Sequence, residues 1–269
     1  MPSDLQLIKA PPEWRVVDFI SDLHLQANEP LTFAAWQRYL ENTRADAVFM
    51  LGDLFEVWVG DDAASDSASP TGRGDPSFEA VCASVLKRAS SRISLHFMHG
   101  NRDFLVGEKF CESTGVTLLD DPCVFEFHSE RWALSHGDAL CLADVDYQLF
   151  RKTVRSPAWQ ASFLAKPLKE RRDIARGLRE QSEARKSAAA TYADADEEAT
   201  LQLLSRASAR LLIHGHTHRP ATHVLPGGLQ RHVLSDWDLT AVPARAQVFR
   251  LALEEPGTAR SARIPLEQA

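Results

Sequence analysis

Five short polar strings each follow directly on a run of hydrophobic, β-branched and aromatic residues, and this repeated pattern constrains the chain more than any other feature. The strings are Asp22-Leu23-His24, Gly52-Asp53, Gly100-Asn101-Arg102-Asp103, His136-Gly137-Asp138 and Gly215-His216-Thr217-His218. A short hydrophobic run of this kind predicts a buried strand, so the side chains just beyond it lie at the edge of a sheet. Five strand ends that carry aspartate, histidine and asparagine predict a metal cluster better than they predict a packed core.

Length and composition are those of an ordinary globular protein. The chain has 269 residues, of which 44% are hydrophobic and 25% charged, and its formal net charge is −7. The strings run from Asp22 to His218, so we expect a single domain over residues 1–269 with one sheet through most of the chain. No apolar run is long enough for a transmembrane helix, and the N-terminus lacks the basic and apolar segments of an export signal, so we expect neither.

The cysteines and the basic residues exclude two other kinds of site. The four cysteines show no paired spacing, so we expect reduced, mostly buried thiols and no zinc site made from them. Between Arg151 and Lys186 there are eleven Lys or Arg against four Asp or Glu, in a chain that is acidic overall. One cationic segment in an acidic protein indicates a local anion site rather than general affinity for nucleic acid.

Hydrophobic and turn patterns predict strands on both sides of one long helical stretch. Helices are expected over residues 31–42 and 77–89, with Ser77 as the N-cap of the second. Strands are expected over residues 14–20, 47–51, 93–98, 123–128, 131–135, 209–213, 223–225, 230–234 and 247–253. Between them lies a stretch without a strand pattern, broken at Pro157 and Pro167, so we expect a helical cap over residues 145–208 inserted into a sheet-based domain.

The spacing of the polar residues favours a pair of hard divalent cations. Asp22 and His24 are two residues apart, as are His216 and His218, so on extended backbone each pair can point the same way. The carboxylate of Asp53 can bridge two cations. A mixed carboxylate, imidazole and amide set without thiolates suits Mn²⁺. Two such ions about 3.5–4 Å apart can clamp a phosphoryl group and generate hydroxide near neutral pH.

Each string taken alone also has an ordinary structural explanation. A single Asp-x-His is common by chance, and the histidine-rich string near residue 216 could be a polar loop. The histidines at positions 96, 128, 223 and 232 lie within strand-like runs and are expected to be structural. The case for metal binding depends on the order and placement of all five strings together.

The ordered set DxH, GD, GNRD, HGD and GHTH resembles the calcineurin-like metallophosphoesterases, and the resemblance covers residues 16–220. It implies an α/β fold, an α/β/β/α sandwich of two sheets flanked by helices, here with a helical cap insertion. It also implies two Mn²⁺ per chain at the sheet edges. By this resemblance one ion is held by Asp22, His24, Asp53 and His218, and the other by Asp53, Asn101, His136 and His216, with Asp53 bridging.

The residue after Asn101 narrows the expected substrate. Many phosphomonoesterases and protein phosphatases of this type have a histidine there, which assists an alkoxide leaving group, whereas this chain has Arg102. An arginine donates no proton at neutral pH, but it pairs with phosphate oxygens in a bidentate way. A phosphate leaving group needs no such proton, since its second pKa is about 6. Arg102 therefore favours cleavage of a phosphoanhydride, and the alternative is a surface salt-bridge partner.

Longer strings are similar to the family of UDP-2,3-diacylglucosamine pyrophosphatases of Gram-negative lipid A synthesis, nearly from end to end. They are FISDLHL, GDLFEVWVGDD, HGNRDFLVG, SHGDALCLADVDYQLFR and LLIHGHTHRPA. The resemblance implies Mn²⁺-dependent hydrolysis by water attack on the α-phosphorus, giving UMP and 2,3-diacylglucosamine 1-phosphate (lipid X). It also implies a cytoplasmic protein associated peripherally with the cytosolic leaflet of the inner membrane, acting on a lipid-linked nucleotide sugar and not on nucleic acid.

The same resemblance implies roles for particular side chains. Asp53, Arg102 and His216 would be catalytic. The substrate would be bound by Asn101, Arg102, Asp144, Arg179, Ser182, Lys186 and His216. The family has a further lysine where this chain has alanines at 188–190, and Lys186 is the candidate to take over its role. The acyl chains could contact the apolar side chains of the cap, or those side chains could simply dock the cap on the body; they are Trp159, Phe163, Leu164 and Leu168.

Two further hypotheses stay open at the level of sequence. One is another dinuclear-metal phosphodiesterase, nuclease or nucleotide pyrophosphatase of the same fold, and nucleic-acid binding would then weaken steeply with salt. The other is a catalytically idle interaction module, for which the cap would be a docking face. The complete ligand set argues against an idle module, and metal analysis of the purified protein distinguishes the two.

Overall fold

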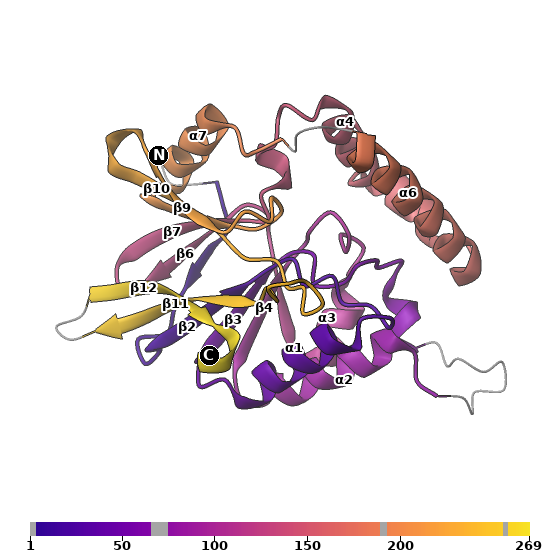
Figure 1. Cartoon of the computed structure of the whole chain (residues 1–269), viewed down its shortest axis with the longest axis horizontal. Coiled ribbons are helices and arrows are strands. Elements are labelled where there is room, and N and C mark those ends of the chain that lie inside the picture. Colours follow the sequence, from indigo (N-terminus) through magenta and orange to yellow (C-terminus); the bar gives the residue numbers. More distant parts are fainter. Residues whose placement is uncertain (1–3, 66–74, 189–192, 255–257) are drawn as a thin grey trace.

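Two six-stranded sheets pack face to face, and helices cover their outer faces (Figure 1). The computed structural model describes residues 4–65, 75–188, 193–254 and 258–269, and for residues 180–188 it describes only the backbone. The first sheet has the order β1-β6-β7-β8-β10-β9, with β1 Leu7–Lys9, β6 Cys123–Phe127, β7 Glu130–Ser135, β8 Leu211–His214, β10 Leu229–Val233 and β9 Ala221–Leu225. The second has the order β12-β11-β2-β3-β4-β5, with β12 Thr258–Pro265, β11 Gln247–Glu254, β2 Val16–Ile20, β3 Ala47–Leu51, β4 Ser94–Met98 and β5 Val116–Leu119.

The helices of the body lie on the outer faces of the two sheets. On the second sheet are α1 Pro30–Asn42, α2 Phe78–Ser90 and α3 Glu108–Thr114, and on the first is α7 Glu197–Ala207. Short 3₁₀ helices cover Asp61–Ser65, Asp138–Leu140, Pro226–Gly228 and Leu266–Gln268. Aromatic side chains fill the space between the sheets, where Phe19 and Phe49 stack with ring centroids 5.1 Å apart and Phe125 meets both. This arrangement confirms the expected α/β/β/α sandwich.

The expectation of one sheet through most of the chain is wrong. Strands β2 to β5 form the second sheet and strands β6 to β10 the first, which β1 joins from the start of the chain; the last two strands, β11 and β12, return to the second sheet. Hydrophobic runs predict that a segment is a strand, but both sheets bury such runs equally, so the pattern does not assign a strand to a sheet.

Parallel pairing brings the carboxyl ends of the central strands to one edge of the sandwich. Strands β2, β3 and β4 pair in parallel, as do β7 and β8. All five residues of β3 are buried, as expected for a parallel strand covered on both faces. The five polar strings follow β2, β3, β4, β7 and β8, so they meet at this edge of the sandwich.

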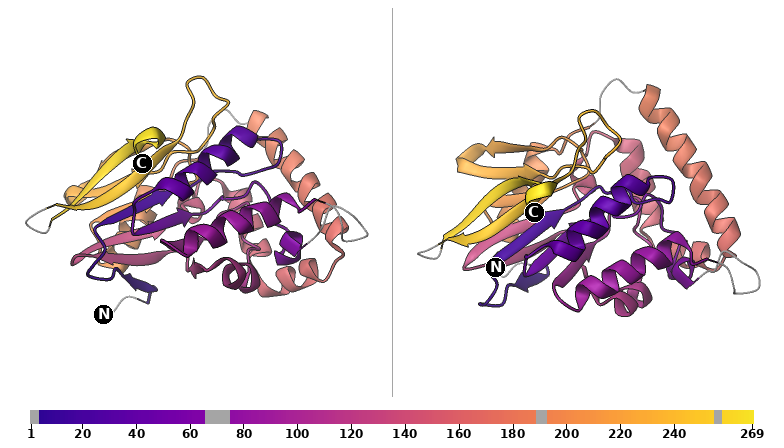
Figure 2. Two further views of the ribbon diagram at one scale, coloured as in Figure 1. Left: turned by 90° about the horizontal axis from the view of Figure 1, so that it is seen from below. Right: turned by 60° about the horizontal axis from the view of Figure 1, so that its bottom comes forward.

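Three helices of the insertion stand apart from the sheets. They are α4 Val145–Val154, α5 Pro157–Leu164 and α6 Leu168–Ala188, and α6 runs along one side of the molecule (Figure 2). Pro157 occupies the first turn of α5 and Pro167 immediately precedes α6, so the two prolines end one helix and begin the next, as expected. The fourth helix of the expected cap, α7, packs its buried Leu203 and Leu204 against the first sheet. Within the described residues no helix has the length and apolarity needed to cross a membrane.

Candidate metal centre

The backbone at the strand ends is left-handed rather than extended. Asp22, His24, Asp53, His216 and His218 have φ angles of 56°, 49°, 52°, 67° and 52°. The prediction of extended backbone for the pair Asp22 and His24 and the pair His216 and His218 is therefore wrong. A left-handed residue turns the chain sharply, so consecutive ligand side chains converge on one point instead of alternating across a strand.

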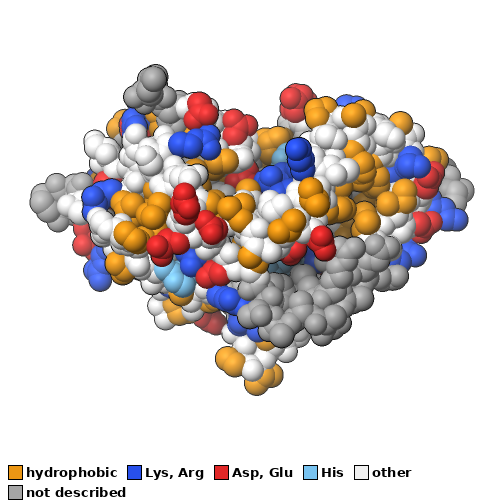
Figure 3. All heavy atoms as spheres, turned by 90° about the horizontal axis from the view of Figure 1, so that it is seen from above, with side chains coloured by type: hydrophobic (Ala, Val, Ile, Leu, Met, Phe, Trp, Pro, Cys, Tyr) orange, Lys and Arg blue, Asp and Glu red, His pale blue; other side chains and the backbone are white. Residues whose placement is uncertain are grey.

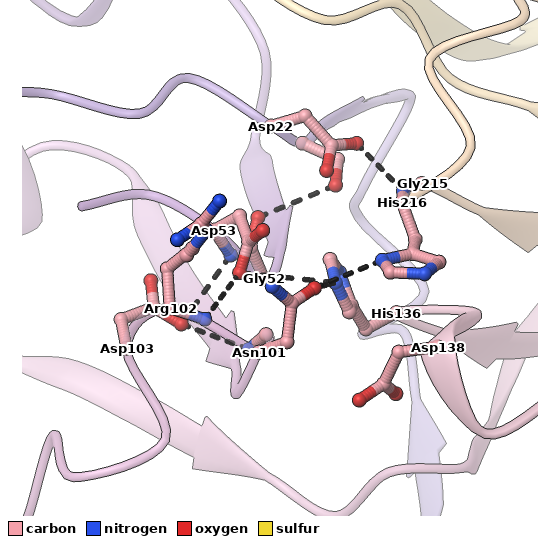
Figure 4. A network of polar contacts seen from close by, with 12 residues as sticks. Asp22, Gly52, Asp53, Asn101, Arg102, Asp103, His136, Asp138, Gly215 and His216 are labelled. Carbon is pink, nitrogen blue, oxygen red and sulfur yellow. Dashed lines mark hydrogen bonds and ion pairs between the residues drawn. The ribbon is translucent and has the colours of Figure 1, made fainter. Parts of the chain in front are cut away.

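Three glycines allow the strand ends to approach one another, and Figure 4 shows two of them, Gly52 and Gly215, beside the ligand side chains. A Cβ atom at Gly100 would lie 2.1 Å from Asp53 Oδ1, and one at Gly215 would lie 2.4 Å from Asp22 Oδ2. At Gly52, where φ is +88°, it would lie 2.5 Å from His136 Nδ1. Contacts below 3 Å exclude any side chain, so these positions of the polar strings require glycine.

The first group of expected ligands converges as the resemblance implies. His218 Nε2 lies 3.4 Å from Asp22 Oδ1 and 3.3 Å from His24 Nε2, and His24 Nε2 lies 3.9 Å from Asp53 Oδ2. Potential ligand atoms of Asp22, His24 and His218 all lie within 4.8 Å of one another. Asp22 and Asp53 are buried, and His218 is the most exposed of the four.

The second group shares Asp53 with the first. His136 Nε2 lies 3.8 Å from Asp53 Oδ1 and 3.0 Å from Asn101 Oδ1. His216 Nδ1 lies 2.8 Å from the same Asn101 oxygen. Atoms of Asp22, Asp53 and His136 also lie within 4.8 Å of one another, so the two groups adjoin and Asp53 faces both. All seven predicted ligands therefore meet in one place.

Several ligand atoms of the site face one another as hydrogen-bond acceptors, so cations would satisfy them better than hydrogen bonds among themselves. His136 Nδ1 lies 2.9 Å from the carbonyl oxygen of Leu51, which accepts a hydrogen bond when the ring proton is on Nδ1. The lone pair of Nε2 then faces the side-chain oxygen of Asn101, and both atoms are acceptors. His24 Nε2 faces His218 Nε2 in the same way, and the buried Asp22 Oδ1 has no hydrogen-bond partner among the described residues. Lone pairs that face one another are satisfied by a cation between them, so this is a dinuclear metal site.

The buried carboxylates give the site an excess of negative charge, which shifts the pKa values of several ligand side chains. Burial alone would lower the pKa of His136, but Asp53, Asp22 and Asp138 outweigh burial and raise it to about 9. Burial opposes ionisation of Asp22, yet the neighbouring histidines, His218 above all, hold the pKa of its carboxyl below its usual range. His216 is different, because burial and the nearby His136 lower its pKa to about 4. A neutral His216 is ready to act as a ligand near neutral pH.

Arg102 lies at the metal site and not on the open surface. Its backbone N–H donates to Asp53 Oδ1 at 2.8 Å, and its side chain is 14% exposed. The guanidinium atom Nη1 lies 3.7 Å from Glu56 Oε1. The alternative of a surface salt-bridge partner therefore does not describe this residue.

The other residues expected to bind substrate differ in how close they lie to the metal site. Arg179, on α6, reaches the site, with Nε 3.2 Å from Glu56 Oε1 and Nη1 3.2 Å from Gln26 Oε1. Asp144 is exposed and caps α4, where its Oδ1 accepts from Tyr147 N at 3.1 Å. Ser182 and Lys186 lie outside the residues whose side chains are described, so their roles stay predictions.

Two buried aspartates that the sequence argument left without a role support the ligands. Asp103 accepts from the backbone N–H groups of Gly100, Leu54 and Phe55 at 2.8, 2.7 and 3.2 Å, and burial and the Asp53 charge raise its pKa to about 7. Asp138 accepts from Tyr147 Oη at 2.5 Å and Arg151 Nε at 2.8 Å, which ties α4 to the segment of His136. Their place in the GNRD and HGD strings was visible, but no local pattern shows that Asp103 binds the backbone after β3 or that Asp138 binds side chains of α4.

The apolar side chains of the insertion divide into two sets. Phe163 is buried, and Trp159 stacks on it with centroids 4.8 Å apart and also meets Phe104, so these rings dock the insertion on the body. Leu168 packs partly against the same core, whereas Leu164 is 42% exposed. On α4 and just before it, Val145 and Leu149 are each 63% exposed and Leu142 is 48% exposed. Figure 3 shows hydrophobic side chains beside basic ones across the face seen from above.

Comparison with known proteins adds relatives that match most of the chain. The calcineurin-like phosphoesterase family matches residues 16–220. A UDP-2,3-diacylglucosamine hydrolase of Ralstonia nicotianae is 42% identical over 247 residues, which cover 87% of this chain and 88% of that protein. The protein of the same name from Escherichia coli O7:K1 is 40% identical over 81% of this chain and 90% of its own length. A dimetal phosphatase from Danio rerio shares 16% identity and a TM-score of 0.45 over 94% of this chain and 99% of that one.

Proposed function

The chain belongs to the calcineurin-like phosphoesterase family, and on this premise we propose that it hydrolyses the diphosphate of UDP-2,3-diacylglucosamine in lipid A biosynthesis. Water attacks the α-phosphorus, and the products are UMP and 2,3-diacylglucosamine 1-phosphate. The observation that carries the proposal is a complete dinuclear ligand set with Arg102 beside it, in a chain 40–42% identical to UDP-2,3-diacylglucosamine hydrolases over most of its length.

In the proposed reaction the side chains of the protein hold the metal ions in position and stabilise the charge on the phosphate. A pair of divalent ions at the site would supply Lewis acidity and a hydroxide nucleophile near neutral pH. Asp22, His24, Asp53 and His218 would hold one ion, and Asp53, Asn101, His136 and His216 the other. Hard carboxylate and amide oxygens mixed with imidazole, without a thiolate, support Mn²⁺ as the ion. The guanidinium of Arg102 pairs with the phosphate oxygens and stabilises the charge that develops there.

The leaving group decides between an ester and an anhydride. The residue next to Asn101 is an arginine, which cannot protonate an alkoxide at neutral pH. A sugar phosphate leaves without a proton, because phosphate is already a stable anion near pH 7. The basic Arg179 of α6 adds a second guanidinium near the site, on the side of the insertion, which supports a substrate with two phosphates.

A lipid-linked substrate also explains apolar surface on the insertion. Each methylene removed from water contributes about 0.8 kcal/mol, so even part of an acyl chain outweighs a few hydrogen bonds. The exposed Leu142, Val145, Leu149 and Leu164 offer such surface on or beside α4 and α5. The proposal therefore includes a cytoplasmic protein bound peripherally to the cytosolic leaflet of the inner membrane, where its substrate resides.

The proposal is tested by incubating the purified protein with UDP-2,3-diacylglucosamine and Mn²⁺ in detergent micelles. Phosphorus NMR and mass spectrometry follow the products, and a chelated sample serves as the control. We expect UMP and the 1-phosphate in equal amounts, only when metal is present. Cleavage of a simple phosphodiester or an oligonucleotide instead would keep the metal site but replace the lipid substrate with that of another phosphodiesterase of the same fold.

A further inference from the structure

Glu56 has a fixed place beside the metal site, although none of the five polar strings includes it. It follows β3 by five residues, and its backbone N–H donates to the carbonyl of Leu25 at 3.2 Å. The preceding residue, Phe55, is held by the buried carboxylate of Asp103. The backbone after Glu56 is anchored as well, since Trp58 N donates to the carbonyl of Arg102 at 3.2 Å. Glu56 itself is only 7% exposed, so its charged side chain is buried in a fixed segment.

The carboxylate of Glu56 contacts three charged or titratable groups at once. Its Oε2 lies 2.8 Å from Nδ1 of His24. Its Oε1 lies 3.2 Å from Nε of Arg179 and 3.7 Å from Nη1 of Arg102. These partners come from the segment after β2, from the segment after β4 and from α6, so one side chain joins a metal ligand to both guanidiniums near the site.

The contacts with His24 and Arg102 leave the atoms of these two residues that would meet the metal and the phosphate available. A carboxylate at Nδ1 keeps the proton of His24 on that atom and directs the Nε2 lone pair toward Asp22, Asp53 and His218, as carboxylates behind metal-bound histidines do. The guanidinium of Arg102 has five N–H groups in a planar fork, so its contact with Glu56 through Nη1 orients it and leaves N–H groups for phosphate oxygens. Arg179 is oriented through Nε by Glu56 and through Nη1 by Gln26.

We propose that Glu56 is a positioning residue that sets His24 for metal binding and, through the same carboxylate, sets Arg102 and Arg179 for the diphosphate. The metal half of this inference rests on the geometry of the site. The diphosphate half rests on the proposed function. Metal affinity and substrate affinity then both depend on one buried side chain that touches neither the metal nor the substrate.

The metal half is tested by equilibrium dialysis of Mn²⁺ against substrate-free Glu56→Gln protein. Glutamine keeps the size of the side chain and removes its charge, so we expect Mn²⁺ to bind about 10–100-fold more weakly than to the wild type. Glu29→Gln is the matched control, because Glu29 Oε1 accepts from Gln26 Nε2 at 2.8 Å close to the site, and among the described residues Glu29 makes no hydrogen bond or ion pair with His24 or a guanidinium. Wild-type Mn²⁺ affinity in Glu56→Gln would overturn the proposal.

The diphosphate half is tested by a double-mutant cycle with Arg102→Ala. We expect Glu56→Gln to raise KM for UDP-2,3-diacylglucosamine at saturating Mn²⁺, and to raise it much less when Arg102 is already alanine. Equal effects of Glu56→Gln on KM in both backgrounds would show that Glu56 does not act through Arg102. If the wild type does not cleave this substrate, the proposed function fails, while the dialysis still decides the metal half.

A second variant keeps the test decisive if Glu56→Gln does not fold. Glu56→Asp keeps the charge in the buried site but is one methylene shorter, so it cannot reach His24 and the guanidiniums together. We expect folded protein by circular dichroism with weakened Mn²⁺ binding. Wild-type binding by Glu56→Asp would mean that charge alone, and not position, is what the site needs.

Discussion

At the metal site, five ligand residues adopt a backbone conformation that is costly for residues with a Cβ. The left-handed φ angles of Asp22, His24, Asp53, His216 and His218 each cost on the order of 1 kcal/mol or more, and the surrounding structure maintains them. Residues in sparsely populated regions of φ and ψ concentrate at functional sites, where the strain fixes side chains in place. Here the strain is the means by which the ends of three strands, β2, β3 and β8, direct five ligand side chains to one point.

Asp53 faces both ligand groups, so its charge is the one that the two cations share. We expect Asp53→Asn to abolish turnover and to lower the bound metal from two ions per chain, because asparagine cannot bridge two cations with a negative charge. The hydrogen bond from Arg102 N to Oδ1 can persist in the variant, so the fold should be retained. Metal analysis and circular dichroism of the purified variant accompany the assay, and wild-type activity would rule out the dinuclear account.

Arg102 supports the anhydride specificity. We expect Arg102→Ala to lower kcat/KM on the diphosphate by about 100-fold or more, the loss of a charge-assisted bidentate contact in a water-poor site, without changing metal content. Arg88→Ala on α2 is the control, because Arg88 is 57% exposed and pairs with Glu41 at 3.6 Å on the surface. An unchanged rate for Arg102→Ala would make this residue structural.

The sequence predicts the ligand types of this site far better than their geometry. The aspartate, histidine and asparagine residues after hydrophobic runs are visible in one dimension, the family resemblance implies seven of them as ligands, and the structure brings these seven side chains together. The extended backbone at Asp22 and His24 was wrong, since no local pattern signals a left-handed aspartate or histidine. Glu56 received no role for another reason: its partners His24 and Arg179 lie far from it in the chain, and only the fold brings them together.

Among the elements, the sequence predicts those that are strongly hydrophobic and misses those at the edges. The buried strand β3 and the Ser77-capped helix α2 appear as expected, and Ser77 Oγ accepts from Ala80 N. The edge strands β1, β5 and β12 were missed, because each lies at the end of a sheet and leaves some of its residues exposed, which interrupts the hydrophobic pattern. The short helix α3 was missed as well, since its seven residues contain too few turns for a clear period.

The insertion is fastened to the body by a buried arginine on α6. Arg171 is 3% exposed, pairs with Asp62, and donates to the carbonyls of Val59 and Lys166. Arg171→Ala should therefore loosen α6, and we expect backbone amides in its first turns to exchange at least about ten-fold faster, because the loss of even one charge-assisted hydrogen bond has an effect of this size.

Hydrogen-exchange mass spectrometry on peptides of α6 measures this loosening. Arg176→Ala is the matched control on the same helix, because Arg176 is 68% exposed and lies 3.5 Å from Asp173 of its own helix. Peptides of α7 should exchange alike in all three proteins, since α7 packs on the first sheet. Equal exchange of α6 in Arg171→Ala and the wild type would show that other contacts hold the insertion.

At the scale of the whole molecule, a neutral histidine is buried beside the aromatic core between the two sheets. The ring of His96 stacks on Phe49 with centroids 4.3 Å apart and meets Trp14 at 6.0 Å. Neither ring nitrogen has a hydrogen-bond partner among the described residues, and burial lowers the pKa of His96 to about 4. The sequence analysis correctly placed His96 among the structural histidines, but it could not predict that two sheets enclose it.

This burial makes the stability of the protein depend on pH. Below the ordinary histidine pKa of about 6.5 the unfolded chain binds a proton at His96, but the folded protein does not until pH 4 is approached, so stability is lost as pH falls between these values. We expect His96→Phe to reduce the difference in unfolding free energy between pH 7 and pH 5 by about 1–2 kcal/mol. Urea titrations at both pH values measure it, and an unchanged difference would show that His96 is not the group that titrates.

The most direct test of the whole account follows the oxygen that enters the product. UDP-2,3-diacylglucosamine is hydrolysed in water enriched in heavy oxygen with Mn²⁺ present, and both products are weighed by mass spectrometry. Attack on the α-phosphorus at the dinuclear site predicts that UMP carries the heavy oxygen, that the sugar 1-phosphate does not, and that chelation abolishes both products. Label in the sugar 1-phosphate, or unlabelled turnover in the chelated sample, would contradict the account.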